Sequence, residues 1–129
     1  MDLDVVTVGG GLGGSTLASA MVRNGRSVLV LEREREFKDR VRGENMLPWG
    51  VAAARRLGIV DGLLAAGGRQ VPFFNIYVMG TQTEHRPFPM TTPTGEASLN
   101  MYHPDLQETL LRGAVNAGAE VMPWYRGPR

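Results

Sequence analysis

Three glycines and one carboxylate near the amino terminus have the types and spacing needed to hold phosphate and ribose. Gly9, Gly11 and Gly14 fit the pattern G-x-G-x-x-G, and Glu32 follows about 20 residues later. The first glycine permits a sharp turn, the second lets a pyrophosphate approach the backbone, and the third lets a helix pack on a strand. A carboxylate at this distance accepts hydrogen bonds from a ribose 2′-hydroxyl and repels a 2′-phosphate. These residues predict a site for FAD or NAD.

The segments around these residues have the composition of the βαβ unit that such a site requires. Residues 5–8 are Val, Val, Thr and Val, which predicts a strand buried on both faces. A helix over residues 13–24 would direct its free N–H groups and the positive end of its dipole at the phosphates. Residues 27–31 predict the second strand, which places the carboxylate at its carboxyl end. Within the turn, further predicted cofactor contacts are Leu12, Gly13 and Ser15.

Arginines that follow the second strand are additional candidates for contact with the dinucleotide. Arg33 directly follows the carboxylate and would lie beside the adenosine. Arg40 and Arg42 alternate in an extended segment before Gly43, which allows close approach of the backbone. The guanidinium fork can bridge phosphate oxygens. The alternative for Arg42 is a surface ion pair with Glu44 that contributes little energy.

The rest of the chain predicts two helices, three antiparallel strands, and a helix and strand that return to the parallel sheet. The expected ranges are helices at 48–57 and 61–64, strands at 73–79, 82–88 and 98–102, a loop at 89–97, a helix starting at residue 104 and a strand at 119–122. His103 precedes that last helix and either faces the cofactor or caps the helix in solvent. The predicted division is 1–70 for the βαβ unit and following helices, 71–102 for antiparallel strands of a substrate layer, and 103–129 for the return.

Composition excludes several classes of protein. The chain has 129 residues, enough for one ordinary domain, and is 43% hydrophobic and 21% charged. A net charge of +1 gives no basis for binding nucleic acid. The chain has no cysteine, which excludes disulfides and thiolate metal sites. There is no signal-peptide pattern and no apolar run of membrane-spanning length, so we predict a cytoplasmic protein without a membrane span.

Several segments, in one order along the chain, carry a resemblance to a known family. They are VGGGLGGSTLA at 8–18, LVLERE at 29–34, RVRGENMLP at 40–48, RRLGI at 55–59 and HPDLQETLL at 103–111. On these segments the sequence resembles the amino-terminal part of FAD-dependent monooxygenases similar to p-hydroxybenzoate hydroxylase. Relatives in that group include squalene epoxidases, flavin-dependent halogenases and geranylgeranyl reductases.

The resemblance implies FAD as the bound cofactor and NAD(P)H as the electron donor. It places Glu32 on the adenosine ribose, Arg33 near the adenine, and Arg42 near the pyrophosphate and ribityl chain. A position that holds an FAD-contacting arginine in the family holds His103 here. The implied enzyme uses O2 to hydroxylate or epoxidise an aromatic, polyketide-like or other apolar small molecule. Because the flavin supplies the chemistry, no catalytic residue and no metal ligand is expected from this chain.

Other functions remain open at this stage. They are a flavin-dependent halogenase or reductase of the same fold, an NAD-dependent dehydrogenase, and a non-catalytic fragment that binds dinucleotide weakly. Because members of the family are longer, the predicted fold is an incomplete α/β fold, a Rossmann-type βαβ unit with an inserted antiparallel β-sheet. Expected partners are a small-molecule substrate and either the remainder of the polypeptide or a second copy, which would cover exposed sheet edges.

Overall fold

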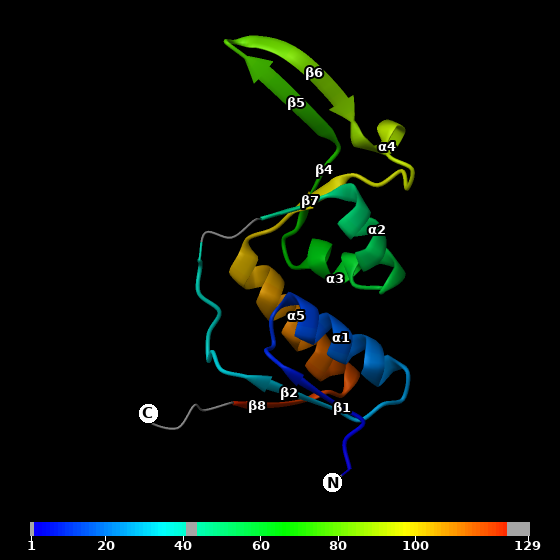
Figure 1. Ribbon diagram of the computed structural model, residues 1–129, viewed down its shortest axis with the longest axis vertical. Helices are drawn as coiled ribbons and strands as arrows, with labels where there is room; N and C mark the ends of the chain where they lie inside the picture. The colour runs from blue at the N-terminus through cyan, green and yellow to red at the C-terminus, as the bar shows by residue number, and fades with distance from the viewer. Residues whose placement is uncertain (1, 41–43, 124–129) are drawn as a thin grey trace. The chain divides into compact units, whose positions relative to one another are not determined.

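The structure of the chain, a computed structural model, describes residues 2–40 and 44–123 (Figure 1). The strands are β1 (Val5–Val8), β2 (Val28–Glu32), β3 (Asn45–Met46), β4 (Arg69–Val71), β5 (Phe73–Val78), β6 (Thr81–Pro87), β7 (Ser98–Asn100) and β8 (Glu120–Pro123). The helices are α1 (Leu12–Arg23), α2 (Pro48–Arg56), α3 (Val60–Ala65), α4 (Phe88–Thr91) and α5 (His103–Ala117). The chain forms two compact units, residues 1–41 with 103–129, and residues 42–102.

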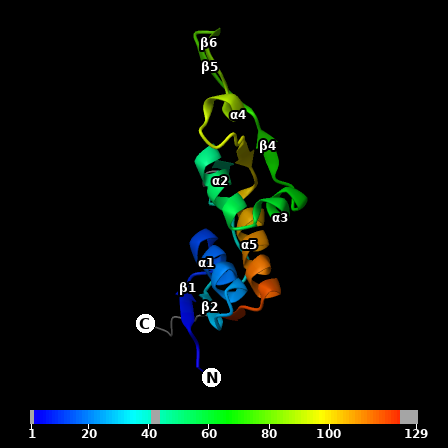
Figure 2. The same ribbon diagram turned by 90° about the vertical axis from the view of Figure 1, so that its right-hand side faces the viewer.

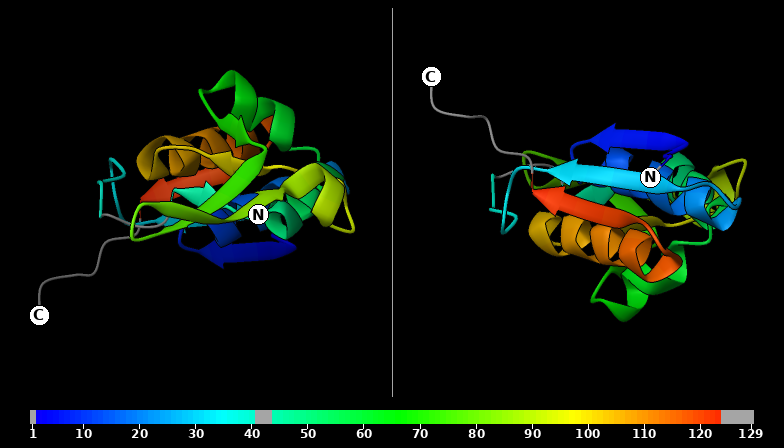
Figure 3. Two further views of the ribbon diagram at one scale, coloured as in Figure 1. Left: turned by 90° about the horizontal axis from the view of Figure 1, so that it is seen from above. Right: turned by 90° about the horizontal axis from the view of Figure 1, so that it is seen from below.

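The first unit is a parallel sheet in the order β1-β2-β8 with α1 and α5 packed on one face (Figure 3). β1 and β8 both pair in parallel with β2, so the predicted βαβ unit and the predicted return to the sheet are confirmed. The core of this unit consists of small or β-branched residues that allow helix and strand to approach closely. They are Ala18, Val28, Val30, Ala114 and Ala119.

The prediction that β1 is buried on both faces is wrong. Thr7 points toward the helices and is buried, whereas Val6 and Val8 on the opposite face are 50% and 69% exposed. Among the described residues, both helices of this unit lie on the same face of the sheet, so the other face has no cover. The β-branched residues of β1 indicate that the segment forms a strand, but they do not indicate whether both faces of that strand are covered.

The second unit contains an antiparallel sheet in the order β3-β7-β4. Helix α2 packs against β7, and α3 packs against α2. Its core is formed by Val51, Ala54, Val60, Leu63 and Leu99, which are all nearly inaccessible to solvent. The prediction that the strand near residue 98 belongs with the two strands before it is wrong, because β7 pairs with β3 and β4 instead. This pairing also explains why residues 42–70, predicted with the βαβ unit, lie in the second unit.

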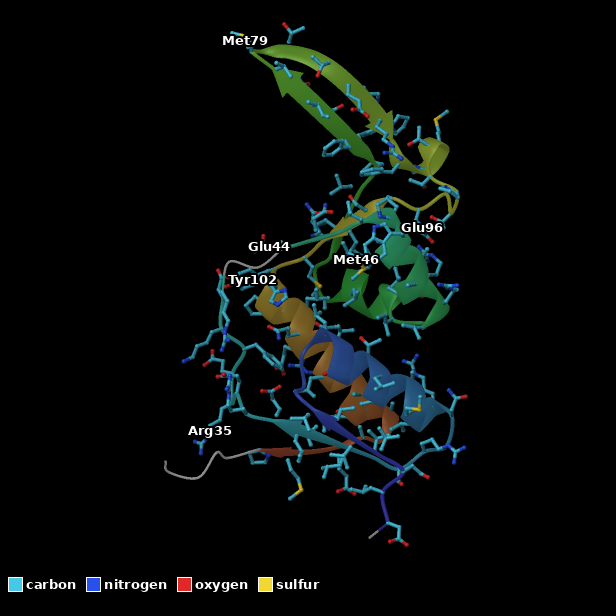
Figure 4. The ribbon with its side chains drawn as sticks, in the orientation of Figure 1. Arg35, Glu44, Met46, Met79, Glu96 and Tyr102 are labelled. Carbon is cyan, nitrogen blue, oxygen red and sulfur yellow. The ribbon has the colours of Figure 1, made fainter. Side chains whose placement is uncertain are left out.

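Strands β5 and β6 form a separate two-stranded hairpin within the second unit. Figure 2 shows the hairpin extending beyond α2, α3 and α4, with Met79 at its tip in Figure 4. The turn is Met79-Gly80, one residue earlier than the sequence predicts, and both residues have positive φ angles of 48° and 84°. Such a turn matches the twist of paired strands. The segment 89–97, predicted as a loop, begins inside the one-turn helix α4.

Candidate dinucleotide-binding site

The chain turns sharply between β1 and α1 at the first glycine of the predicted pattern. Gly9 has a φ angle of 105°, a conformation that residues with a side chain rarely adopt. Its backbone N–H donates to the carbonyl of Leu31 in β2 at 2.8 Å. The turn therefore begins at the carboxyl end of the parallel strands, where ligands bind in sheets of this kind.

Gly14 provides the close helix-to-strand contact that the sequence predicts. A Cβ atom at this position would lie 1.9 Å from the carbonyl oxygen of Gly9. Atoms cannot approach so closely, so any residue other than glycine would displace α1 from β1 or open the turn. At Gly11, by contrast, the atom nearest to an added Cβ would be Gln107 Nε2 at 3.4 Å, an ordinary contact. The predicted approach of a pyrophosphate to Gly11 stays a prediction.

Glu32 lies at the end of β2 and its carboxylate holds the glycine turn in place. Oε2 accepts the backbone N–H of Gly10, and Oε1 accepts the N–H of Glu34 at 2.7 Å. A Cβ on Gly10 would lie 3.0 Å from Glu32 Oε2, so a side chain there would crowd this contact. Gly10 was not among the predicted site residues, although the run of three consecutive glycines was a visible signal.

Ser15 supports the same turn from inside the protein. The residue is fully buried, and its hydroxyl donates to the carbonyl of Gly10 at 2.6 Å. Gly10 is therefore held through its N–H by Glu32 and through its carbonyl by Ser15. This fixes the orientation of the peptide groups in the turn before any ligand binds. Direct contact between Ser15 and a cofactor stays a prediction.

The amino-terminal end of α1 has the properties of an anion site. The helix begins at Leu12, no side chain caps it, and its first turn contains no acidic residue. Leu12 and Gly13 are exposed, so the backbone at this end is accessible to solvent. The first N–H groups of a helix have no partner within the helix, and together with the dipole they favour a phosphate.

One face of α5 borders the glycine turn. The side chain of Gln107 lies beside Gly11, and that of Leu111 lies beside Gly10 together with Glu32. His103 lies one turn before Gln107 on the same helix face. The Nδ1 atom of His103 is buried and has no hydrogen-bond partner among the described residues. The structure thus places His103 and the glycine turn in the same unit. Gln107 was missed in the sequence, where its position four residues after His103 was the available signal.

Arg33 and Arg40 share one carboxylate. Glu34 Oε1 accepts hydrogen bonds from Arg33 Nη2 at 3.1 Å and from Arg40 Nη2 at 3.0 Å. The Arg33 hydrogen bond, with the charges of the neighbouring cations, lowers the pKa of Glu34 below its ordinary value. Arg42 and Gly43, predicted to approach the pyrophosphate, lie outside the described residues.

Comparison with known proteins identifies the family. A family model described as FAD binding domain matches residues 2–123 of the chain. The chain belongs to the FAD binding domain family. The predicted resemblance to FAD-dependent monooxygenases is confirmed.

Related sequences of this FAD binding domain include squalene epoxidases. The chain is 35% identical over 96 residues to squalene epoxidase erg1 of Schizosaccharomyces pombe, which covers 74% of this chain and 21% of that protein. It is 37% identical over 87 residues to squalene epoxidase 6 of Arabidopsis thaliana, covering 67% of this chain and 17% of that protein. The chain therefore spans about a fifth of the length of these relatives.

Solved structures share the fold of this FAD binding domain. A PqsL variant from P. aeruginosa superimposes with a TM-score of 0.77 at 24% identity, covering 93% of this chain and 33% of that one. The myxobacterial chondrochloren halogenase CndH gives a TM-score of 0.74 at 24% identity, covering 94% of this chain and 28% of that one. Both comparisons confirm the α/β fold predicted from the sequence.

The residues of the cradle fit FAD on physical grounds. Gly9 has a backbone conformation that favours glycine, and Gly14 leaves no room for a side chain. The start of α1 is free of acidic residues, and Glu32 lies at the strand end.

Across residues 2–40 and 44–123, no helix combines the length and apolarity that crossing a membrane requires. In the same part of the chain, no three His, Asp or Glu side chains are grouped to hold a metal ion.

Proposed function

We propose that this chain is the FAD-binding portion of a flavin-dependent monooxygenase that takes electrons from NAD(P)H and uses O2 to hydroxylate or epoxidise an apolar small molecule. The observation that carries the proposal is the glycine turn held between Glu32 and Ser15 at the open start of α1. This arrangement presents backbone N–H groups where a pyrophosphate would bind. Membership of the FAD binding domain family supports FAD over NAD as the ligand.

Within this proposal each part of the cradle has a role in binding. The start of α1 and the glycine turn hold the pyrophosphate, and Glu32 accepts the hydroxyl groups of the adenosine ribose. Arg33, Arg40, Arg42 and His103 are the further proposed contacts. Bound FAD supplies the redox and oxygen-transfer chemistry, while the chain binds and orients it. Glu32 contributes to both binding and shape, because it also fixes the Gly10 peptide.

The relatives support a proposal for the class of substrate. Both relatives compared in sequence are named squalene epoxidases, and this supports epoxidation or hydroxylation of an apolar molecule. The similarity covers about a fifth of those proteins. We therefore propose a class of reaction and not a particular substrate.

A titration of the chain with FAD tests the proposal directly. We expect saturable binding of FAD, followed by the change in flavin fluorescence, and weaker binding of NADH and NADPH. Glu32→Gln should weaken FAD binding by about 10- to 100-fold, because one N–H donor and the ribose lose an ionised acceptor. Glu36→Gln, an exposed acid in the same segment, is the matched control and should leave the affinity unchanged.

The alternatives give different results in the same experiment. Tighter binding of NADH than of FAD would favour an NAD-dependent dehydrogenase. Absence of FAD binding, with the chain folded by circular dichroism, would overturn the proposal. In the complete protein we expect a yellow colour and consumption of NAD(P)H that increases when an apolar substrate is present.

A further inference from the structure

A cavity of about 330 Å³ lies in the second unit, and none of its residues belongs to the dinucleotide site. It is formed by the start of α2, the end of β6, α4 and the segment that follows α4. We refer to it as the α2–α4 pocket, lined by Leu47, Pro48, Trp49, Arg86, Phe88, Thr92, Pro93 and Thr94. Its volume is near the lower end of the range for small-molecule sites, roughly 300–1,000 Å³. A ligand with one or two rings, or a short acyl chain, would match this size.

The wall of the pocket is mostly apolar. Trp49, in the first turn of α2, is 74% exposed, an unusual exposure for so large an apolar side chain. Phe88 in α4 is buried and stacks on Phe74 of the hairpin, with 6.2 Å between the ring centroids. Exposed aromatic surface in a concave site favours binding of an apolar group, because both surfaces are removed from water.

Arg86 is the only charged residue among those that line the pocket. Its guanidinium carbon lies 5.9 Å from the centre of the Phe88 ring, and its Nε donates to Thr91 Oγ1 at 3.2 Å. Within the described part of the chain, no carboxylate forms an ion pair with it. The first turn of α2 also contains no acidic residue. The electrostatics of the pocket therefore favour an anion, and the guanidinium fork suits a carboxylate.

Contacts behind the wall hold the pocket in shape. Arg55 of α2 forms a two-point ion pair with Glu96, in which Nη2 donates to Oε2 at 2.9 Å. Figure 4 shows Glu96 beside α2, so this pair fixes the segment after α4 to the helix. The hydroxyl of Thr92 donates to the carbonyl of Phe88 at 2.8 Å. A site that is already formed loses less conformational entropy when a ligand binds.

We propose that the α2–α4 pocket binds a small carboxylate with an apolar body. The apolar part lies against Trp49 and Phe88, and the carboxylate pairs with Arg86. The carboxylate can carry either an acyl chain or an aromatic ring, because a ligand of either kind would use the apolar wall and the Arg86 guanidinium. The residues that line the pocket are separate from the described residues of the cradle.

Nuclear magnetic resonance of the Trp49 indole N–H tests the proposal. The sequence has two tryptophans, so the Trp124→Phe variant leaves Trp49 as the single indole signal. The probes are sodium octanoate and sodium 2-naphthoate, each compared with its neutral amide. We expect at least one carboxylate to shift the signal saturably, with an affinity at least about tenfold above that of its amide. Which carboxylate binds better distinguishes an acyl from an aromatic ligand.

Variants of Arg86 then test the role of the cation. Arg86→Gln should reduce carboxylate affinity to that of the amide, whereas Arg86→Lys should keep part of the preference because the charge remains. Arg69→Gln, an exposed arginine of β4 outside the pocket, is the matched control and should bind as the parent does. Failure of both carboxylates to shift the signal, equal binding of acid and amide, or equal behaviour of Arg86→Gln and Arg69→Gln would each overturn the proposal.

Discussion

Gly10 is held by the protein through both of its backbone polar groups. Its N–H and its carbonyl are engaged by a carboxylate from the end of β2 and by a buried hydroxyl from α1. Charge-assisted hydrogen bonds such as that of Glu32 are stronger than neutral ones. The peptide groups of the turn are therefore oriented by the protein alone, which lowers the cost of ordering the turn when a ligand binds.

Gly14→Ala should destabilise the first unit strongly. The new methyl group would collide with the carbonyl oxygen of Gly9, and neither backbone segment can move without breaking the turn. We expect the free energy of unfolding, measured with urea, to fall by at least about 2 kcal/mol. FAD binding should be lost as well, because the glycine turn would no longer keep its shape.

Gly13→Ala is the control for that change. It is the neighbouring residue, and a Cβ there would meet no atom within 4 Å. Its unfolding free energy should stay within about 1 kcal/mol of the parent, because alanine favours a helix more than glycine does. Equal loss of stability in the two variants would contradict the packing role of Gly14.

At the scale of residues, the sequence predicted where the cradle residues lie along the strands and helices better than it predicted which residues they contact. The pattern of glycines and the place of Glu32 at the strand end were both predicted correctly. The bond from Gly10 to Glu32 joins residues 22 apart, and its geometry depends on how the turn and strand meet in space. The same holds for Gln107, which reaches the turn only because α5 packs beside α1.

Among the elements, α2 and the segment after α4 are joined by one ion pair. Glu96 is largely covered, with 13% of its side chain exposed, while Arg55 is 49% exposed. The hydrogen bond from Arg55, and after it the charge of Arg55, lower the pKa of Glu96 below 4.5 against the opposing effect of burial. A lowered carboxyl pKa stabilises the fold above the unfolded value, and this stabilisation is lost as pH falls through the folded value.

Acid should therefore weaken the parent protein more than Glu96→Gln. Between about pH 5 and about pH 3, protonation of Glu96 removes the ion pair in the parent, whereas the glutamine variant has no carboxylate to protonate at this position. We expect a steeper fall in the urea unfolding free energy of the parent over this window. Glu84→Gln, an exposed acid of β6 without an ion pair in the described part of the chain, should follow the parent curve. Parallel curves for the parent and Glu96→Gln would contradict the prediction.

Most helices and strands were predicted, as was the pairing within the parallel sheet and within the hairpin, but β3, β4 and the pairing of β7 were missed. Hydrophobic period and glycine positions located every helix of more than one turn, because these signals are local. The pairing of β7 with β3 and β4 was missed, since β3 is two residues long and its partner lies more than fifty residues away. Alternation along a strand shows that it pairs but does not identify the neighbour.

At the scale of the molecule, the described cradle residues all lie in the first unit, whereas the α2–α4 pocket lies in the second. Hydrogen exchange should reflect this division. We expect FAD to slow amide exchange in residues 9–15 and 32–34, where the turn and Glu32 would contact it, because bound ligand suppresses local opening. The hairpin, residues 73–87, should exchange at the same rate with and without FAD.

Riboflavin is the control for this experiment, because it lacks the pyrophosphate and the adenosine. It should leave residues 9–15 unprotected. Protection by FAD that is greatest in the hairpin would place the dinucleotide elsewhere and contradict the proposed cradle.

Strands β2 and β8 are neighbours in the first unit but lie far apart along the chain, which affects when they can pair during synthesis. β2 pairs with β8, yet all of residues 42–102 are synthesised between them. On the ribosome, the second unit can therefore complete its contacts while β2 has only β1 as a neighbour. Long-range pairing of this kind is slow to form and leaves strand edges open until it is complete. A nascent chain paused before residue 120 would expose the edge of β2 that β8 later covers, which makes this stage a point where chaperones would bind.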